Sequence, residues 1–293
     1  MSFNLSITPA QIEILSKIGK TITQTYQIKN NSDSIVNLST SIEQWQPINN
    51  DGSIQYLPES TSPVLFSLLN ADLKLGQIFS LPPNQSTQLI LKIQIPQSIP
   101  ESYFTLFLKQ ENQSKNETSS YLSSFSNTNA KIGSHILIAT SETENLNHQA
   151  TITNFTVTPK IKDMFFSKIK FDIEIQNQSD YLFKNQGQLI IAKNNTVFKE
   201  ISLFPNNTLA NHSRLIRCTQ PSVETGFKPV SSPISCSLSP PFWPGLYQAS
   251  VKLDNNIKLS NNSTSFFILP ISPIIFILLI TALFLTIKKR FFS

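Results

Sequence analysis

The longest apolar run of the chain most limits what it can fold into. Residues 266 to 287 read FFILPISPIIFILLITALFLTI and contain no charged side chain. As a helix rising about 1.5 Å per residue, this run would cover about 33 Å, the thickness of the hydrocarbon core of a bilayer. A buried core helix is the alternative, but such helices are seldom so long without a polar break. The sequence therefore predicts one transmembrane helix at 266–287.

The residues beside this run predict its orientation. Lys288, Lys289 and Arg290 follow at once, and basic residues next to a span favour the cytoplasmic side. We expect a short cytoplasmic tail at 288–293 and a single-pass protein of the cell membrane whose larger part lies outside. The first ten residues, MSFNLSITPA, have neither the basic nor the apolar region of a signal peptide, which conflicts with export. We expect that an upstream signal is missing here; the alternative is a tail anchor that leaves the domains in the cytoplasm.

Alternating apolar and polar residues predict β-strands in the rest of the chain. From Ile22 to Ile28 the apolar residues recur with period two, as on a half-buried antiparallel strand. Turn residues, such as NDG at 50–52 and PPN at 82–84, separate these segments. Gly is scarce at 7 residues and Pro is common at 18, which suits extended strands with proline-limited ends. The sequence therefore predicts an all-β fold before the apolar run.

Length and polarity predict two domains. The residues before the span suffice for two domains of ordinary size, and we place them at 1–145 and 146–265. The first contains a Ser- and Asn-rich stretch at 110–130, which predicts a long mobile loop. The polar segment SETENLNH at 142–148 separates two strand-like segments and is the expected boundary.

The two halves show the same order of local patterns, which predicts an internal repeat. An alternating strand runs into an Asn turn at 26–33 and again at 171–180. Pro100 to Tyr103 opens a late strand in the first half, as Pro244 to Tyr247 does in the second. Both halves therefore look like one type of sandwich.

The same short motifs resemble a known family of surface proteins. They are Asn30, DGSIQY at 51–56 and Pro100 to Tyr103 in the first half, and Asn177, Gly187 and Pro244 to Tyr247 in the second. They resemble bacterial surface and periplasmic Ig-like domains, including pilus-chaperone-like β-sandwiches. Two such domains, one C-terminal span and a short basic tail are similar in layout to the WxL-interacting proteins of Gram-positive cell surfaces. The resemblance implies two Ig-like domains, one associated with peptidoglycan and one with a host or partner protein.

Cys218 and Cys236 are the only cysteines of the chain. A disulfide between them would close a loop of about 18 residues and stabilise the fold by about 3 kcal/mol. Two buried thiols are the alternative. A zinc site is not expected, because no CxxC motif or nearby His pair completes four ligands.

No pattern in the sequence indicates catalysis or a cofactor. His135, His148 and His212 stand without a His, Cys or carboxylate at ligand spacing. Phosphate-binding glycine loops and the common hydrolase motifs are absent. The net charge of +5 comes from scattered basic residues and the cluster at the span, so no nucleic-acid-binding surface is expected. We therefore expect a protein that is not an enzyme and needs no cofactor.

Two aromatic residues of the first domain are the binding candidates. Trp45 ends the strand SIEQW, and Tyr56 ends the segment DGSIQY; Trp243, in the corner PPFWPG of the second domain, is a weaker candidate. Each also has an ordinary interpretation as a packed side chain. The sequence predicts a membrane-anchored surface protein whose sandwiches bind cell-wall polymer (peptidoglycan) or a protein partner. The alternatives are a wall-acting enzyme with an unrecognised site, and a structural subunit of an envelope complex.

Overall fold

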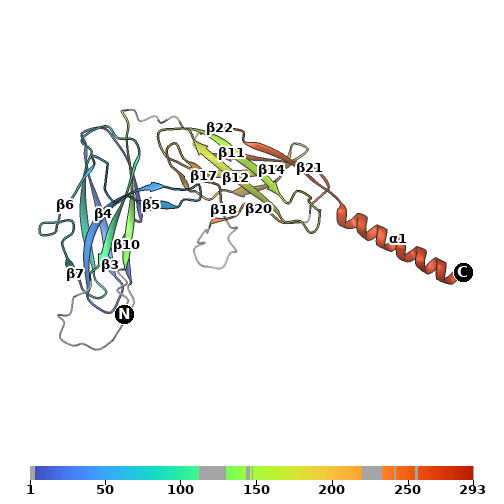
Figure 1. The fold of residues 1–293 in the computed structure, drawn as a ribbon, viewed down its shortest axis with the longest axis horizontal. Helices are drawn as coiled ribbons and strands as arrows, with labels where there is room; N and C mark the ends of the chain where they lie inside the picture. The colour runs from blue at the N-terminus through green and yellow to red at the C-terminus, as the bar shows by residue number, and fades with distance from the viewer. Residues whose placement is uncertain are drawn as a thin grey trace. The chain divides into compact units, whose positions relative to one another are not determined.

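The structure is a computed structural model of the 293-residue chain and describes residues 4–111, 130–142, 146, 148–219, 233–240, 242–254 and 257–292. The chain divides into two compact units, residues 1–48 with 53–146 and residues 49–52 with 147–293. Each unit is an Ig-like β-sandwich (Figure 1), so the prediction of an all-β fold with two such domains is confirmed. Most of the expected polar loop at 110–130, and residues 143–145 and 147 of the expected boundary, lie outside the described residues.

The first domain consists of two facing sheets. The four-stranded sheet has the order β1-β3-β8-β6, and its strands are β1 (Leu5–Thr8), β3 (Thr21–Asn30), β8 (Ser86–Gln94) and β6 (Leu65–Leu68). The six-stranded sheet has the order β2-β10-β9-β4-β5 with β7 also on β4, and its strands are β2 (Gln11–Ser16), β10 (Lys131–Thr140), β9 (Ser102–Gln110), β4 (Val36–Pro47), β5 (Ile54–Tyr56) and β7 (Phe79–Leu81).

Strand β3 shows how the sequence pattern builds this sandwich. Along its second half, Tyr26 and Ile28 are buried, while Gln27 between them and Lys29 after them are exposed. The alternation places one face of the strand on the core and the other in water. Buried side chains from both sheets form the core, among them Leu38, Leu89, Leu91, Ile93, Phe104, Leu106, Leu108, Ile136 and Ile138.

The second domain has the same two-layer construction. Its five-stranded sheet has the order β17-β12-β11-β22 with β20 on β12, and the strands are β17 (Ser213–Leu215), β12 (Ile169–Asn177), β11 (Gln149–Thr158), β22 (Lys258–Ser260) and β20 (Ser237–Leu238). The facing sheet has the order β15-β14-β21-β23, and its strands are β15 (Thr196–Ser202), β14 (Gly187–Lys193), β21 (Gly245–Leu253) and β23 (Ser263–Ile268). Two short pairs complete the domain: β13 (Phe183–Lys184) with β16 (Asn207–Thr208), and β18 (Cys218–Thr219) with β19 (Pro233–Ile234).

A buried asparagine at the end of a strand makes the same contacts in both domains. In the second, Asn177 Nδ2 donates to the carbonyls of Tyr181, Thr208 and Leu209, and its Oδ1 accepts from the N–H of Ser179. Short polar side chains that bond nearby backbone are well suited to turns.

Asn30 repeats this arrangement in the first domain. Its Nδ2 donates to the carbonyls of Ser34, Leu81 and Pro82, and its Oδ1 accepts from the N–H of Ser32. Both asparagines are fully buried. In each domain the side chain therefore joins the turn after its own strand to a segment far along the sequence.

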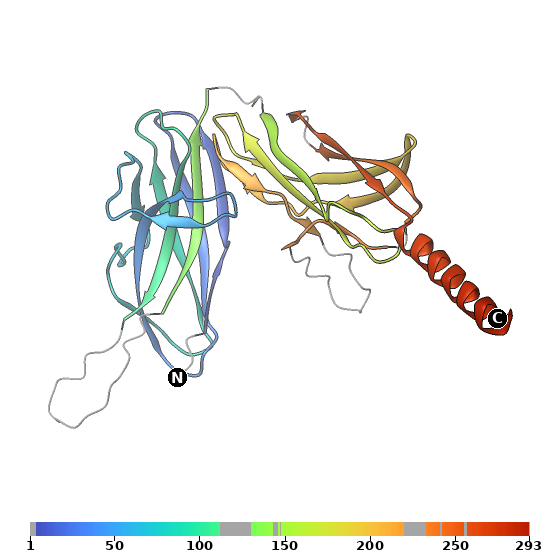
Figure 2. The ribbon, with the colours of Figure 1, turned by 45° about the vertical axis from the view of Figure 1, so that its right-hand side comes forward.

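The predicted transmembrane helix does not begin where the sequence suggested. Residues 266–268 belong to strand β23, which pairs with β21, and Phe266 and Ile268 are buried in the core of the second domain. The helix α1 (Ile271–Phe292) starts only after Leu269 and Pro270. Figure 2 shows the strand running directly into the helix.

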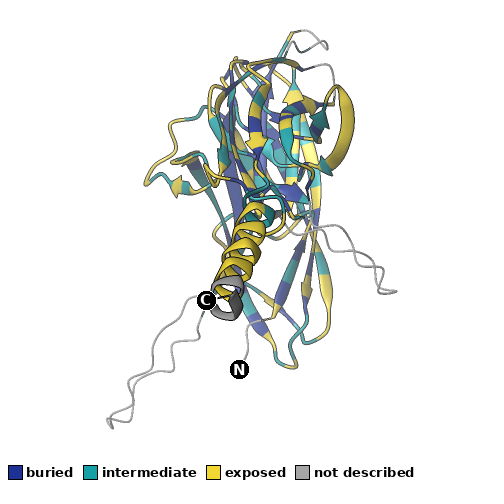
Figure 3. Cartoon of the chain, turned by 90° about the vertical axis from the view of Figure 1, so that its right-hand side faces the viewer, coloured by how far each residue is buried: buried dark blue, intermediate teal, exposed yellow. Residues whose placement is uncertain are grey.

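This boundary shortens the apolar helix. The apolar part of α1, residues 271–287, would cover about 25 Å, less than the roughly 30 Å of a hydrocarbon core. Its large apolar side chains are exposed (Figure 3). Within the described ranges, no helix is both long and apolar enough to cross a membrane. The predicted transmembrane helix was therefore wrong, and so was the single-pass localisation in a cell membrane, which depended on it.

Asp163 holds the start of the helix on the second domain. Its carboxylate accepts hydrogen bonds from the N–H and the hydroxyl of Ser272, at 2.7 and 3.0 Å, and from the N–H groups of Phe165 and Phe166. Burial raises the pKa of Asp163, but these donors outweigh it and lower the pKa to about 2. The aspartate therefore caps α1 as a charged group.

Candidate functional site

The first strand of the chain changes sheets. β1 pairs antiparallel with β3 in the four-stranded sheet, from Leu5 opposite Asn30 to Thr8 opposite Gln27. After the cis peptide bond at Pro9 the chain enters the other sheet, where β2 pairs in parallel with β10. β1 and β2 are each shorter than the strand they pair with, so within the described ranges each sheet keeps a stretch of edge without a strand partner.

The open stretch of β10 is its first four residues. β10 pairs with β9 from Lys131 onward, but with β2 only from His135 onward. The N–H of Gln110 donates to the carbonyl of Ala130, and the N–H of His135 donates to that of Ala10, each at 3.0 Å. The backbone N–H and C=O groups of even-numbered residues of β10 therefore point toward β9, and those of odd-numbered residues point toward the opposite edge.

Lys131 and Gly133 consequently present their N–H and C=O groups at this edge. In the part of the chain that the structure describes, no strand pairs with them on that side. Among the described residues, two N–H donors and two C=O acceptors thus remain for pairing with an added strand. We call residues 131–134 the β10 edge.

The corresponding open stretch of β3 is partly blocked by a side chain. β1 pairs with β3 only from Gln27 onward. The backbone N–H and C=O groups of Thr21, Thr23 and Thr25 therefore point toward the part of the edge that β1 does not cover. The Nε2 of Gln24 donates to the carbonyl of Thr25 at 2.8 Å. An edge capped in this way is a poorer template for another strand. No such cap covers the β10 edge among the described residues.

A glycine brings an aromatic ring against the β10 edge. A Cβ on Gly133 would lie 2.5 Å from Cγ2 of Thr105 and 2.9 Å from Cδ1 of Phe107. Only glycine therefore allows the Phe107 ring to lie across the strand here. The ring itself is packed, with only 6% of Phe107 exposed.

A charged cluster lies beside the same ring. The Nζ of Lys131 is 3.9 Å from the centre of the Phe107 ring, within the range of a cation–π contact. Glu43 accepts from Lys109 at 3.0 Å and from Lys131 at 3.4 Å. Burial raises the pKa of Glu43, but the hydrogen bond and charge of Lys109, with the charge of Lys131, hold that pKa below its ordinary value. The carboxylate is therefore charged at neutral pH.

The two binding candidates from the sequence lie together on the outer face of this sheet. Trp45 is directly opposite Tyr56 on β5 and Tyr103 on β9. Its ring stacks on Tyr103 at 4.7 Å between centres and meets the edge of His135 at 5.5 Å. Only 5% of Trp45 is exposed. It is therefore a packed side chain here rather than an open stacking surface.

Tyr56 links this aromatic group to the β10 edge. Its ring meets the Phe107 ring at 5.2 Å, and its hydroxyl is 3.3 Å from the Thr105 hydroxyl. The Lys131 ammonium is 5.2 Å from the Tyr56 ring. Of the two sequence candidates, Tyr56 is therefore the one that lies beside the open edge.

Trp243 lies apart from these residues, in the second domain. Its side chain is 72% exposed, and its carbonyl accepts a hydrogen bond of 2.9 Å from the buried Tyr247 hydroxyl. Burial raises the pKa of Tyr247, against the opposing effect of that bond. The arrangement fixes the corner at 243–247, but no described neighbour joins Trp243 to a site.

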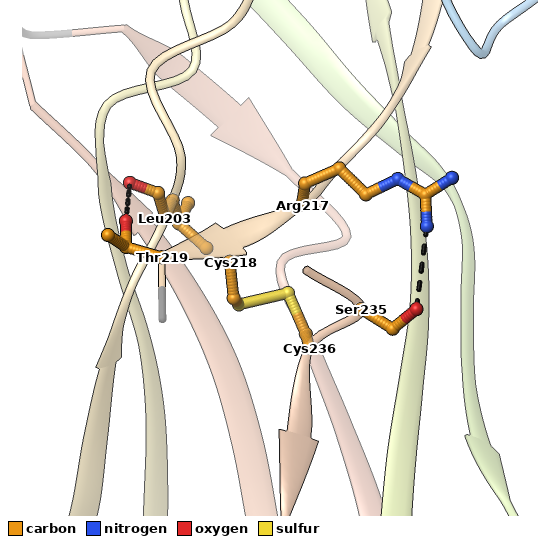
Figure 4. The surroundings of a disulfide bond; sticks show 6 residues. All are labelled: Leu203, Arg217, Cys218, Thr219, Ser235 and Cys236. Carbon is orange, nitrogen blue, oxygen red and sulfur yellow. Dashed lines mark hydrogen bonds between the residues drawn. A yellow bond between two sulfur atoms is a disulfide. The ribbon is translucent and has the colours of Figure 1, made fainter. Parts of the chain in front are cut away.

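Cys218 and Cys236 are joined by a disulfide in the second domain, with Cα atoms 4.9 Å apart (Figure 4). Cys218 lies in β18 and both cysteines are buried in the core. Beside the bond, the Thr219 hydroxyl donates to the carbonyl of Leu203 at 3.2 Å. The bridge is part of the core and lies beside no described catalytic group.

The three histidines make separate, local contacts. His135 Nδ1 is 2.9 Å from the Thr105 hydroxyl, His148 meets the Phe183 ring, and His212 Nδ1 is 2.6 Å from the carbonyl of Ala210. Burial lowers the pKa of His135 and of His148. Among the described residues, no three His, Cys, Asp or Glu side chains lie close enough together to hold a metal ion.

Comparisons with known proteins show similarity at the level of the fold. No family model matches the sequence, and no curated protein matches it. The chain is similar to the class 5 fimbriae chaperone CfaA, with 12% identity over 91% of this chain and 100% of that chain and a TM-score of 0.41. It is also similar to the E. coli chaperone DraB, with 11% identity over 90% and 95% and a TM-score of 0.37. A third structure is the Salmonella enterica SafA pilin with the SafB chaperone, with 12% identity over 91% and 96% and a TM-score of 0.38.

These findings correct two expectations from the sequence. The resemblance to WxL-interacting proteins was wrong: no family model supports it, and these structures of similar fold are fimbrial chaperones. The expected function as a membrane-anchored, wall-binding protein was wrong as well, because it depended on a span that the described residues do not contain. At such low identity no residue's role is carried over from these structures.

Proposed function

We propose that this chain is a non-enzymatic protein-binding protein that takes an extended segment of another surface protein as an added strand on the β10 edge. The observation that carries the proposal is the pairing pattern of β10. β2 covers only residues 135–140, while the backbone groups of Lys131 and Gly133 point outward. Addition of a strand to an open edge is a common mode of peptide recognition.

The size of the edge sets the strength of the contact. Two residues offer four main-chain hydrogen bonds, each worth about 1 kcal/mol net, so the backbone contributes about 4 kcal/mol. The loss of translational and rotational freedom on association costs about as much or more, so the backbone bonds alone give little net affinity. Affinity and specificity must therefore also come from side chains beside the edge, and the half-buried Tyr56 is placed for this.

The class of partner is supported by the fold. Some structures of similar fold are complexes of a chaperone with a pilin or with a tip adhesin. In this chain, an exposed strand of another surface protein is the ligand that an uncapped edge accepts. The capped β3 edge is the poorer site, because Gln24 already occupies the carbonyl of Thr25.

The test compares two changes at one position. Lys131→Pro removes an N–H that faces the edge and none that faces β9, and proline is tolerated at the first residue of a strand. Lys131→Ala removes the same side chain but keeps the N–H. Pull-downs with the full chain against isolated envelope proteins should capture less of the partner with Lys131→Pro than with Lys131→Ala, because the lost hydrogen bond is worth about 1 kcal/mol.

Circular dichroism and thermal unfolding serve as the control for folding of both variants. Equal capture by the two variants would show that the edge backbone is not used. Absence of any captured protein with the unchanged chain would contradict the proposal as a whole.

A further inference from the structure

The second domain contains a polar recess in addition to the features described so far. It has a volume of about 410 Å³ and lies over strands β14, β15 and β21. Its polar lining consists of Gln186, Gln188, Ser202, Lys252 and Asp254. All five side chains are exposed, and none makes a hydrogen bond or ion pair with a described residue.

The strand register arranges these side chains in two rows. In the first row, Gln188 on β14 lies between Ser202 on β15 and Lys252 on β21. In the second row, Gln186 lies opposite Asp254, whose N–H donates to the Gln186 carbonyl at 2.8 Å. Gln186 and Asp254 lie just beyond the ends of β14 and β21, and their hydrogen bond continues the same register. Because positions two apart share a face in extended chain, the two rows lie about 6.7 Å apart.

Gly187 fixes the distance between the strands under the recess. Its φ is +154°, and a Cβ there would overlap the carbonyl oxygen of Lys252. Any other residue would push β14 and β21 apart and separate the side chains that each row brings together.

The two rows differ in charge. The first offers an ammonium group with an amide and a hydroxyl, which together suit a carboxylate. The second offers a carboxylate with an amide, which suits an ammonium group. A ligand that fits both rows carries opposite charges about as far apart as the rows.

We propose that this recess binds a dipeptide in its zwitterionic form. An extended chain spans about 3.3 to 3.6 Å per residue, so two residues match the row spacing of about 6.7 Å, whereas the charges of a single amino acid are too close together. The peptide carboxylate lies at Lys252, Gln188 and Ser202, and its ammonium group lies at Asp254 and Gln186. No covalent step is involved.

The probe is glycylglycine, titrated against the full chain by ligand-observed NMR. Three analogues test the two rows: N-acetyl-glycylglycine lacks the ammonium group, glycylglycinamide lacks the carboxylate, and glycine is too short. We expect saturable binding of glycylglycine in the millimolar range, with each analogue weaker by about five-fold. Equal binding of either blocked analogue, or of an uncharged sugar such as glucose, would overturn the proposal.

Variants with a matched control locate the site. Lys252→Met should weaken glycylglycine binding but leave glycylglycinamide binding unchanged, because the amide has no carboxylate to lose. Asp254→Asn should weaken glycylglycine binding but leave N-acetyl-glycylglycine binding unchanged, because the acetylated peptide has no ammonium group to lose. Lys170 and Asp172 on β12 have the same two-residue spacing and are also exposed, so Lys170→Met and Asp172→Asn are the controls. Binding that is insensitive to Lys252→Met, or lost in the control variants, would place the ligand elsewhere and refute the assignment.

Discussion

Replacing Asn177 by alanine should be among the most damaging single changes in the second domain. The side chain is fully buried and bonds to three carbonyls and one N–H of the backbone. Alanine fills less space and can replace none of these bonds. The carbonyls of Thr208 and Leu209 lie on a segment distant in sequence, so the change also loosens the contact between two parts of the domain.

The expected loss follows from the number of groups left without a partner. The Nδ2 has two hydrogens for three carbonyls, so Asn177→Ala removes about two strong donors and one acceptor. A buried backbone group that loses its partner costs about 1 kcal/mol or more, which gives a loss of about 3 kcal/mol in the free energy of unfolding. For a domain of this size, that corresponds to a fall of about 10 °C in the melting temperature.

Urea unfolding followed by hydrogen exchange and mass spectrometry measures the effect in each domain separately. Asn262→Ala is the control, because Asn262 is exposed and makes one long bond, 3.4 Å, to the carbonyl of Val251. We expect a change within about 0.5 kcal/mol for this control. A loss below about 1 kcal/mol for Asn177→Ala, or destabilisation confined to the first domain, would refute the reasoning. Asn30→Ala should reproduce the effect in the first domain.

Three further changes test other parts of the structure. Because the pKa of Asp163 is lowered to about 2, its contribution to stability should be present above the unfolded pKa of about 4 and lost as the pH falls toward 2; Asp163→Asn should flatten this dependence in acid unfolding curves. Replacing Cys218 and Cys236 by serine should lower the stability of the second domain by about 3 kcal/mol, and thiol labelling should find no free cysteine before reduction and two after it. Gly133→Ala should displace Phe107 and lower thermal stability by about 1 to 3 kcal/mol; an unchanged melting temperature would show that the ring does not need the glycine.

The class of fold could be predicted from the sequence because strand patterns are local. The alternation from Ile22 to Ile28 identifies β3, and its buried Tyr26 and Ile28 lie on the expected face. What local alternation does not encode is which strand pairs with which. The change of sheet at Pro9, which leaves the β10 edge open, depends on pairing between residues more than a hundred positions apart. Local patterns therefore indicate strands but not the unpaired stretch of edge that β2 leaves on β10.

The error at the end of the chain has a different cause. A continuous apolar run fits a helix in lipid and also the last strand of a sandwich followed by a helix, and hydropathy does not separate the two. The segment STSFFI at 263–268 contains the distinguishing pattern, because Phe266 and Ile268 are buried while Phe267 is exposed. Two aromatic residues and an isoleucine in succession are uniformly apolar in sequence, so hydropathy does not reveal that their burial alternates.

The binding candidates illustrate a limit of composition. The sequence offers Trp45 as the end of the strand SIEQW and Tyr56 as the end of the segment DGSIQY, and the structure brings the two together on one face. Gly133, Lys131 and Phe107 are not among the sequence candidates, because their place beside the β10 edge depends on which backbone groups of the sheet remain unpaired. A glycine inside a strand often marks a bulge or the close approach of another group. Gly133, in the strand segment KIGSHILIAT, is such a glycine.

The junction between β23 and α1 has a mechanical consequence. Only Leu269 and Pro270 separate the paired strand from the helix, and Asp163 binds the first turn of that helix. A force applied to the helix is therefore transmitted directly to β23, because no flexible linker separates the two elements. The hydrogen bonds between β21 and β23 carry that load together with the Asp163 carboxylate and the backbone bonds that join Leu269 to Lys162 and Met164.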